Sequence, residues 1–352
     1  MNCKLNPWLA ENLVCPRHQV ALLVAESTLG CPHGCRYPVV EGTPVMLLDD
    51  EPQTIGLCEA SLQQARKGQD ETGLYLNSIG LSESERRGIL ELSRNASKID
   101  PAVAFLVSAT NGIAYKHLIG TLDRYPIPQL RLPPSRGKVF LDVGCNWGRW
   151  SIAAARLGYQ PVGLDPSLGA VMAAKRVTRQ LGLEATFVVG DARFLPFKPA
   201  AVDQVFSYSV LQHFSRADAA QAIAQIGRVL KPQGASLIQM PTKVGLRCLY
   251  HQAKRKFREG TGFEVRYWTI PALRSLFTSN IGPSKFSVDC FFGIGLQRAD
   301  LDLMQPMLRT AIHLSEALRT VSRVIPPLVW LADSVYVSSL KPGAAVPANP
   351  FG

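Results

Sequence analysis

The stretch from Val139 to Trp150 constrains the fold of this chain more than any other. Residues 139–143 form an apolar run, residues 144–148 form a turn with two glycines, and an alanine-rich helix is expected from about Trp150. A strand that enters a helix through such a turn presents backbone N–H groups and the positive helix end to a ligand. The dinucleotide-binding fingerprint G-x-G-x-x-G is excluded, because positions 146 and 149 hold Asn and Arg instead of glycine.

The alternation of strand and helix continues downstream. Short apolar runs at 160–165 and 185–192 end in or near an acid, Asp165 and Asp191 respectively. Two more strands are expected at 203–209 and 235–240, and helix-period segments at 168–181 and 217–230 lie between the strands. Strands that alternate with helices predict a parallel sheet covered on both faces.

The run Asp-x-Gly-x-x-x-Gly at residues 142–148, followed by these elements in this order, resembles class I S-adenosylmethionine-dependent methyltransferases, with the general UbiE-like subgroup nearest. The resemblance covers about residues 136–342. It implies an α/β, Rossmann-like fold with a seven-stranded sheet that is mostly parallel and has an antiparallel last strand. The late strands are then expected near 285–292 and 334–340, with helices over 300–324 as a C-terminal cap.

The resemblance also implies S-adenosyl-L-methionine as the cofactor, bound in a cleft at the carboxyl ends of the strands. By position, Asp142 helps to hold the methionine ammonium, Asp165 contacts the ribose hydroxyls and Asp191 contacts the adenine amino group. Taken singly, Asp165 and Asp191 are explained equally well as polar ends of buried strands, but together at this spacing they favour a ligand-binding role. The other expected cofactor residues are Gly144, Cys145, Asn146, Trp147, Gly148, Pro166, Ala192 and Ser207.

Methyl transfer from a sulfonium requires alignment and exclusion of water, and a general base only where the acceptor carries a proton. His213, just beyond the fourth strand, is the candidate base, and Tyr208 is a second catalytic candidate. A packing or capping role explains His213 equally well. Tyr115 and His117, ahead of the first strand, are further pocket candidates. The sequence at 207–210 lacks both the Asn/Asp-Pro-Pro-aromatic motif and a Pro-Cys nucleophile, which favours a small-molecule acceptor.

A second motif lies near the N-terminus, where Cys15 and His18 form one pair and Cys31 and Cys35 form another. This spacing matches a structural zinc ribbon. It resembles the ribbon domain shared with activator subunits of tRNA and protein methyltransferases. His18 departs from the usual cysteine, and His33 is an alternative ligand. A degenerate ribbon without metal is the competing interpretation.

Charge is unevenly distributed along the 352 residues. The formal net charge is +11, yet residues 1–60 carry −4. Basic residues gather at 243–266, where an amphipathic basic helix is expected over 246–257. An anionic substrate, nucleic acid, an anionic membrane surface and a plain solvated face all fit this pattern. The apolar segment 324–332 is too short and too rich in proline to span a bilayer.

The sequence thus predicts a zinc-ribbon domain over 1–50, a helical lid or linker region over 51–135, the methyltransferase domain over 136–342 with its basic insertion 243–266, and a tail over 343–352. Eight cysteines without a disulfide-like arrangement, and no signal peptide, predict a cytoplasmic protein. The expected activity is methyl transfer to a small, possibly anionic molecule. The alternatives are an RNA methyltransferase that grips tRNA or rRNA with the ribbon and basic insertion, and a non-catalytic methyltransferase-like partner.

Overall fold

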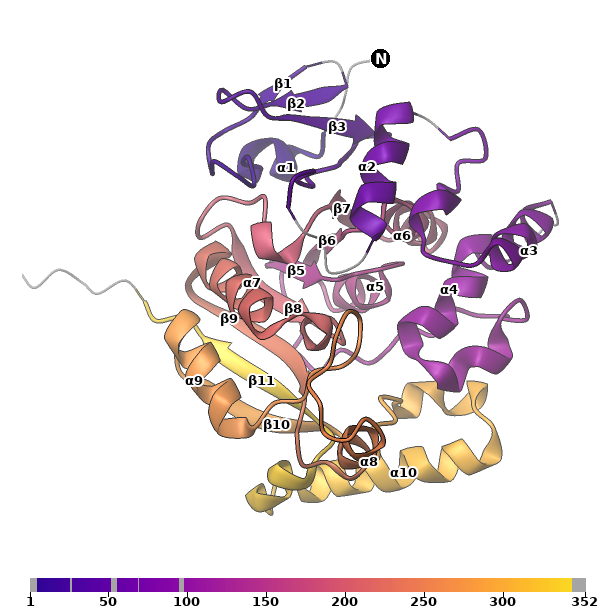
Figure 1. The fold of residues 1–352 in the computed structure, drawn as a ribbon, viewed down its shortest axis with the longest axis vertical. Coiled ribbons are helices and arrows are strands. Elements are labelled where there is room, and N and C mark those ends of the chain that lie inside the picture. Colours follow the sequence, from indigo (N-terminus) through magenta and orange to yellow (C-terminus); the bar gives the residue numbers. More distant parts are fainter. Residues whose placement is uncertain (1–4, 26, 52–55, 69, 95–97, 344–352) are drawn as a thin grey trace, which may run out of the picture.

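The computed structural model describes residues 5–25, 27–51, 56–68, 70–94 and 98–343. It has three parts along the chain, which are a small N-terminal sheet, a helical region and a large α/β unit (Figure 1). The tail expected from residue 343 lies outside the described residues except for its first residue.

The large unit is built on a seven-stranded sheet of order β10-β11-β9-β8-β5-β6-β7. Strand β11 is antiparallel to both of its neighbours, and the pairs β5–β6, β5–β8, β6–β7 and β8–β9 are parallel. This confirms the predicted fold class, including the antiparallel last strand. The strands are β5 (Val139–Val143), β6 (Gln160–Asp165), β7 (Thr186–Val189), β8 (Val202–Ser207), β9 (Leu230–Pro241), β10 (Ser284–Cys290) and β11 (Ser334–Leu340).

Two strand boundaries differ from the sequence prediction. Strand β9 begins at Leu230 rather than near 235, and its register shifts between the pairs Val202–Leu230 and Gln204–Ala235. Residues 231–234, which include Pro232 and Gly234, therefore form an irregular strand start, with Gln233 in a left-handed conformation (φ 63°). Strand β10 ends at Cys290.

Helices cover both faces of the sheet, because alternate strand residues point to opposite sides. Trp150 and Ala154 of α5 pack with Phe140 and Phe206 on one face. Helices α7 and α9 pack against the residues of the other face, such as Leu141 and Val205. The helices of this unit are α5 (Arg149–Arg156), α6 (Leu168–Gln180), η3 (Ala192–Phe194), η4 (Leu211–His213), α7 (Arg216–Val229), α8 (Leu246–Lys254), α9 (Ile270–Asn280), η5 (Arg298–Leu303), α10 (Pro306–Val321) and η6 (Pro326–Leu331).

The helical region begins at α2 (Leu57–Lys67) and continues through η1 (Leu76–Ser78), α3 (Glu83–Ser93), α4 (Pro101–Asn111) and η2 (Ile113–Leu118). Ser82 and Glu85 form a reciprocal capping box at the start of α3. Asp100 caps α4 by accepting hydrogen bonds from the backbone N–H groups of residues 102 and 103. Helix α4 packs with α5 and α6, so this region covers one side of the large unit.

The N-terminal sheet has the order β1-β2-β3-β4 and docks on the free edge of the large sheet. Val45 forms a parallel bridge with Val189 at the end of β7, and the Val189 carbonyl accepts a hydrogen bond from the Met46 N–H. Leu13 forms an antiparallel bridge with Phe197, and Trp8 packs on the Phe197 ring. The elements are α1 (Pro7–Asn12), β1 (Leu23–Val24), β2 (Thr28–Gly30), β3 (Arg36–Val40) and β4 (Thr43–Pro44).

No helix in the described part of the chain is long and apolar enough to cross a bilayer.

Candidate active site

A cavity of about 510 Å³ lies at the carboxyl ends of the central strands. Its walls come from the turn after β5, the ends of β6 and β7, the segment after β8, and the helical region. This is the edge at which parallel α/β sheets bind ligands. Of the sequence-predicted cofactor and catalytic residues, eight line it, namely Gly144, Asn146, Asp165, Pro166, Asp191, Ala192, Tyr208 and His213.

The turn after β5 owes its shape to residues in left-handed backbone conformations. Gly144, Asn146 and Gly148 have φ values of 77°, 45° and 81°. Asn is one of the few non-glycine residues that tolerate this region. A Cβ on residue 144 would lie 2.2 Å from a Val210 methyl group, so glycine is also needed for space.

Asp142 lies beneath this turn with 1% of its surface exposed. Its Oδ2 accepts a hydrogen bond from the Ser151 hydroxyl at 2.7 Å, whereas Oδ1 is buried without a partner. Burial raises the pKa of Asp142 to about 7. An unpartnered buried carboxylate oxygen is costly unless a donor or cation reaches it, so the site is suited to a positively charged group.

Asp165 ends β6 at the cavity wall. Its Oδ2 accepts a hydrogen bond from the Asn146 N–H at 2.9 Å, and its Oδ1 accepts one from the Ser167 N–H at 3.0 Å. Burial raises its pKa to about 6, against the effect of these two backbone bonds. Each oxygen keeps acceptor capacity, since a carboxylate has about four lone-pair sites.

Asp191 is held more tightly than the sequence suggested. Both of its oxygens accept hydrogen bonds from the Arg193 guanidinium, the shortest at 2.7 Å, and Arg193 also pairs with Asp218. Ala192 begins the short helix η3 that follows. Asp191 therefore has a structural partner already, and a ligand at this wall meets a carboxylate whose charge is balanced.

Besides Asp142, four of the predicted cofactor residues do not line the cavity. The Cys145 thiol and the Trp147 ring are buried beneath the turn, and Gly148 is the N-cap of α5. The Ser207 hydroxyl donates to the Val143 carbonyl and ties β8 to β5. These residues support the turn from the side that faces away from the cavity, because only some positions of a five-residue turn can face the cavity.

His213 and Tyr208 line the same wall of the cavity, but their hydrogen bonds and pKa shifts suit them to different roles. The Phe263 carbonyl lies 2.7 Å from His213 Nδ1, which indicates the Nδ1–H tautomer and leaves Nε2 as the acceptor nitrogen. Burial, with the nearby Arg266, lowers the pKa of His213. The Tyr208 hydroxyl instead donates to Asp289 at 3.1 Å, and its burial next to that carboxylate raises its pKa well above the ordinary value. His213 is thus suited to accept a proton, and Tyr208 is not.

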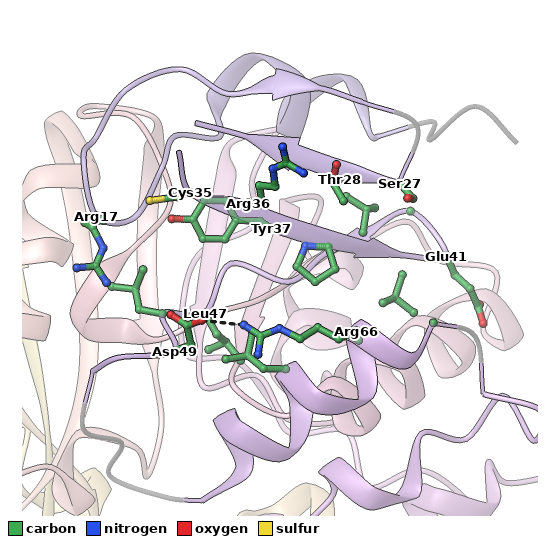
Figure 2. Close-up of a pocket in the computed structure, with 18 of the residues that line it drawn as sticks. Arg17, Ser27, Thr28, Cys35, Arg36, Tyr37, Glu41, Leu47, Asp49 and Arg66 are labelled. Carbon is green, nitrogen blue, oxygen red and sulfur yellow. Dashed lines mark hydrogen bonds and ion pairs between the residues drawn. The ribbon is translucent and has the colours of Figure 1, made fainter. Parts of the chain in front are cut away.

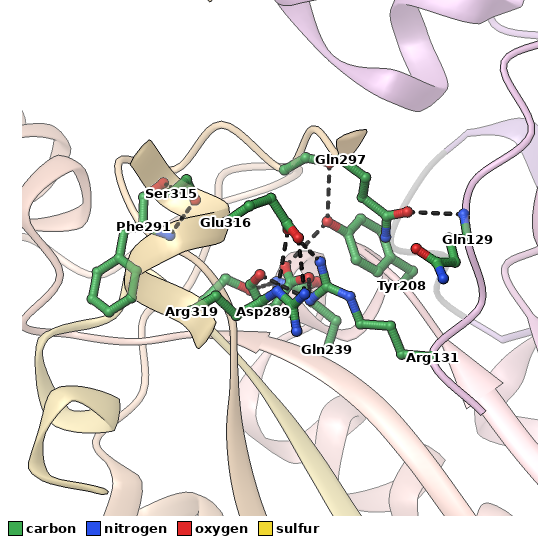
Figure 3. A network of polar contacts seen from close by, with 12 residues as sticks. Gln129, Arg131, Tyr208, Gln239, Asp289, Phe291, Gln297, Ser315, Glu316 and Arg319 are labelled. Atoms are coloured by element: carbon green, nitrogen blue, oxygen red, sulfur yellow. Dashed lines mark hydrogen bonds and ion pairs between the residues drawn. The ribbon is translucent and has the colours of Figure 1, made fainter. Parts of the chain in front are cut away.

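The partner of Tyr208 belongs to a buried polar network behind the cavity (Figure 3). Arg131 lies between Asp289 and Glu316, at 3.6 and 2.8 Å, and Arg319 also pairs with Glu316. Two cations and two anions balance one another here. The network joins the proline-rich segment before β5 to β10 and α10, so its role is to fix the cap.

Sequence reasoning missed the apolar wall of the cavity and misplaced two residues. The wall comes mainly from Leu57, Cys58, Ile79, Leu106, Val210, Phe214 and Phe263. Its members are scattered over three parts of the chain, and no motif marks them. Tyr115 and His117 were expected near the pocket, but they contact the cap instead, through Asp300 and the Leu303 carbonyl. The short helix η2 faces η5 and the start of α10, which explains the difference.

A second, larger hollow of about 1290 Å³ separates β3 from α2 (Figure 2). Arg66 and Asp49 form an ion pair across it at 2.8 Å, with both side chains largely exposed. None of the acids at the strand ends reaches this hollow. The smaller cavity is therefore the candidate active site.

The ribbon residues Cys15, His18, Cys31 and Cys35 come together, and their ligand atoms all lie within 4.8 Å of one another. His18 Nδ1 is 3.6 Å from the sulfurs of Cys15 and Cys35 and 3.3 Å from that of Cys31. Tetrahedral zinc with Zn–S of about 2.3 Å and Zn–N of about 2.0 Å has ligand separations of roughly 3.5–3.8 Å. His33 stacks on His18 but is not part of this set.

Cys15 is poised to ionise within the cluster. Burial disfavours its thiolate, but hydrogen bonds from the Tyr37 hydroxyl and the His18 backbone outweigh burial and lower its pKa. The Tyr37 hydroxyl lies 3.1 Å from the Cys15 sulfur. Such an outer partner orients a ligand and supports metal binding.

Comparison with known proteins bears on the α/β unit. Residues 140–234 match the family model described as "Methyltransferase domain". This part of the chain therefore carries the sequence features of a methyltransferase domain. The matched residues run from β5 into β9 and so include the glycine turn, Asp165, Asp191 and His213.

Two curated relatives match the methyltransferase domain. One is the ubiquinone biosynthesis O-methyltransferase of Azorhizobium caulinodans, 29% identical over 30% of this chain and 42% of its own length. Another is an uncharacterized methyltransferase of Synechocystis, 34% identical over 33% of this chain and 53% of its own. The chain thus spans about half or less of the length of these relatives. Among solved structures, Haemonchus contortus phosphoethanolamine N-methyltransferase 2 with S-adenosyl-L-methionine is 18% identical, with a TM-score of 0.43 over 75% of this chain and 61% of that one.

Proposed function

We propose that the protein transfers a methyl group from S-adenosyl-L-methionine to a small, largely apolar acceptor. The observation that carries this proposal is the cavity at the carboxyl ends of β5 to β8, lined by the glycine turn and Asp165, within the part of the chain that matches the methyltransferase family. The cofactor supplies an electrophilic methyl group on a sulfonium. The protein has to hold the two reactants in line and exclude water.

The residues of the site fit the cofactor. The unpartnered buried oxygen of Asp142 suits an ammonium group, and the free acceptor capacity of Asp165 suits ribose hydroxyls. Gly144 and Asn146 give the ligand access to the backbone of the turn. The Arg193 guanidinium already balances the charge of Asp191, so this carboxylate does not act on the ligand alone. We therefore assign the adenine end of the cofactor to the wall that Asp191 and Ala192 form together.

The acceptor class follows from the opposite wall. Leu106, Val210, Phe214 and Phe263 make it apolar, and no Lys or Arg lines the cavity among the described residues. An anionic acceptor would lack a counter-charge, so a phosphorylated or carboxylated substrate fits less well than an apolar one. This narrows the broader expectation of a possibly anionic substrate.

His213 is proposed as the general base for an acceptor that carries a proton. Its Nδ1 is oriented by the Phe263 carbonyl, and Gln212 Nε2 lies 3.2 Å from its Nε2. A lowered pKa keeps the imidazole neutral at pH 7, so Nε2 can take the proton that the acceptor loses. The Phe263 ring stacks on the imidazole, with the ring centroids 3.9 Å apart, and so helps to orient it.

We further propose that Cys15, His18, Cys31 and Cys35 hold one structural Zn²⁺. Four protein ligands close the coordination sphere, which leaves no position for water or substrate. The ribbon therefore supports the fold and takes no part in methyl transfer.

Calorimetric titration with S-adenosylmethionine and with its demethylated product tests the cofactor assignment. Asp165→Ala should weaken binding at least about tenfold, because each hydrogen bond to a charged group is worth about 1.5–3 kcal/mol. Asp302→Ala, at an exposed acid far from the cavity, is the control and should bind like the wild type. Unchanged binding by Asp165→Ala would contradict the ribose assignment.

His213→Gln tests the base once an acceptor has been found by screening apolar hydroxyl and amine compounds. We expect the rate of methyl transfer to fall about 10²- to 10⁴-fold with cofactor affinity unchanged. If RNA is the true acceptor, binding will fall steeply with salt, whereas a neutral small molecule shows little salt dependence. Binding that falls steeply with salt would therefore contradict a small, largely apolar acceptor.

A further inference from the structure

Helix α8 presents its apolar residues to solvent rather than to the protein. Of its nine residues, Cys248 and Gln252 are buried, and they mark the inward face. Leu246, Leu249 and Tyr250 are spaced i, i+3 and i+4 on the outward face, with Leu246 67% and Tyr250 63% exposed. A surface helix normally buries such a stripe, so this one lacks the apolar partner that its pattern requires.

A second exposed apolar segment lies beside the start of α8. It contains Val324, which is 81% exposed, together with the exposed Ile325, Trp330 and Leu331. Asp333, which follows this segment, accepts hydrogen bonds through Oδ1 from the backbone N–H groups of Arg247 and Cys248, at 2.7 and 3.0 Å. The two segments are therefore fixed to each other, and both lie at the lower end of the molecule in Figure 1.

Positive charge lies beside the apolar stripe formed by Leu246, Leu249 and Tyr250. Residues 243–258 contain six Lys and Arg and no Asp or Glu. Arg247 and Lys254 are spaced i and i+7, so they form a basic stripe along one side of the apolar one. Arg258 pairs with Glu264, but in the described parts of the chain no ion pair neutralises Lys243, Arg247, Lys254 or Lys256.

From this juxtaposition we infer that α8 and residues 324–331 form a docking surface for an anionic lipid bilayer. A bilayer accepts both halves of the pattern, because the apolar side chains enter the acyl boundary while the lysines and arginines contact anionic headgroups. Nucleic acid would satisfy the charges but leave Leu246, Tyr250 and Val324 in water. A short helix with an apolar outward face and Trp330 nearby fits binding in the plane of the interface.

The docking surface is connected to the cavity. The chain that leaves α8 returns to the cavity wall, where Phe263 stacks on His213 and Arg266 donates to the His213 carbonyl at 2.6 Å. Docking would thus hold this wall near the bilayer, from which an apolar acceptor can be drawn. Bilayer binding itself does not depend on methyl transfer, so the two proposals fail separately.

Co-sedimentation of the full chain with vesicles tests the inference. The wild type should bind phosphatidylcholine vesicles that contain phosphatidylglycerol, and bind pure phosphatidylcholine vesicles much more weakly. Leu246→Asp/Tyr250→Asp should weaken binding about tenfold or more, since the apolar contact is lost at exposed positions. Lys254→Gln/Lys256→Gln should weaken binding about fivefold per charge. Leu23→Asp, at an exposed apolar residue of the ribbon strand β1, should bind like the wild type.

Three outcomes would overturn the inference. The first is that the wild type, folded by circular dichroism, fails to bind anionic vesicles. The second is that Leu246→Asp/Tyr250→Asp binds them fully. The third is salt-sensitive RNA binding that is lost in Lys254→Gln/Lys256→Gln but kept in Leu246→Asp/Tyr250→Asp, which would assign the surface to nucleic acid.

Discussion

The ribbon and the methyltransferase domain are held together by different means. Strands β5, β6 and β8 of the domain have almost entirely buried residues and form the centre of a core with helices on both sides. The ribbon strands are at most five residues long, and their buried residues, such as Leu29 and Tyr37, belong to the same core as the large sheet. The strands of the domain form a core with the helices of the same domain. The buried residues of the ribbon pack into that core, and the ribbon adds a cluster of three Cys and one His. Short sheets of this kind rarely persist without a metal or a partner.

Removal of one of the four proposed zinc ligands gives the largest expected effect. It tests directly whether the ribbon depends on a metal while the domain does not. Cys31→Ser should abolish binding of one zinc ion per chain, because the metal site loses a buried thiolate. In zinc-finger peptides the metal contributes about 10–16 kcal/mol to folding. We expect the ribbon to become sensitive to proteolysis while the domain stays folded, as measured by limited proteolysis and elemental analysis.

His33→Ala is the matched control for this experiment, since His33 adjoins the cluster without belonging to it. It should keep the metal and the protease resistance of the wild type. If freshly purified wild type contains no zinc, the ribbon is held by packing alone. If Cys31→Ser retains the zinc, Cys31 is not one of its ligands.

A smaller effect is expected in the domain from Gly144→Ala. The left-handed backbone costs about 1–2 kcal/mol for alanine, and the collision with Val210 adds about 1–3 kcal/mol. Gly182→Ala has a similar φ of 64° but open space around it, so it should show the backbone cost alone. Denaturant unfolding measures both; equal losses would show that the Val210 contact is unimportant.

The pH dependence of the empty and cofactor-bound domain should run in opposite directions. Burial raises the pKa of Asp142 to about 7 and that of Asp165 to about 6, so the folded state binds these protons more tightly than the unfolded chain does. Both groups therefore make the empty protein more stable as pH falls from 7 towards 4. Cofactor binding needs the carboxylates and should weaken over pH 7 to 5.

Thermal unfolding at several pH values, with and without S-adenosylmethionine, measures both trends. Asp142→Asn removes the titration near pH 7 and should flatten the upper part of each curve relative to the wild type. Cofactor affinity that stays constant from pH 8 to pH 5 would contradict the role given to these two acids.

The smallest effect is expected at the ion pair between Asp49 and Arg66. Both side chains are about 60% exposed, and such pairs contribute roughly 0–1 kcal/mol. Arg66→Gln should therefore leave the ribbon docked, as judged by the same proteolysis assay. Release of the ribbon by this change would mean that charge, rather than the backbone bridge and apolar contacts, holds it in place.

The sequence predicted those features that depend on local order along the chain. The strand β5, its glycine turn and the acids at the ends of β6 and β7 follow from short patterns that a sheet must place at one edge. The pairing of Cys15 and His18 with Cys31 and Cys35 follows in the same way, because ligand spacing determines which side chains can meet.

Features that depend on packing between distant segments could not be predicted. The stacking of Phe263 on His213 joins residues fifty positions apart, and Arg193, which holds Asp191, also pairs with the more distant Asp218. Tyr115 was misplaced for the same reason, since nothing in its own neighbourhood indicates that it meets Asp300. Helical periodicity indicated that α8 is amphipathic, but periodicity does not tell which stripe faces outward.

The bridge between Val45 and Val189 has a consequence for how the protein behaves on dilution. Two separate chains joined by such a contact would dissociate as their concentration fell below the dissociation constant. Here both sides belong to one folded polypeptide, so their effective concentration is high and does not change with dilution. The edge strand β7 therefore stays covered however few copies of the chain are present, and no competitor is expected to displace the ribbon by mass action alone.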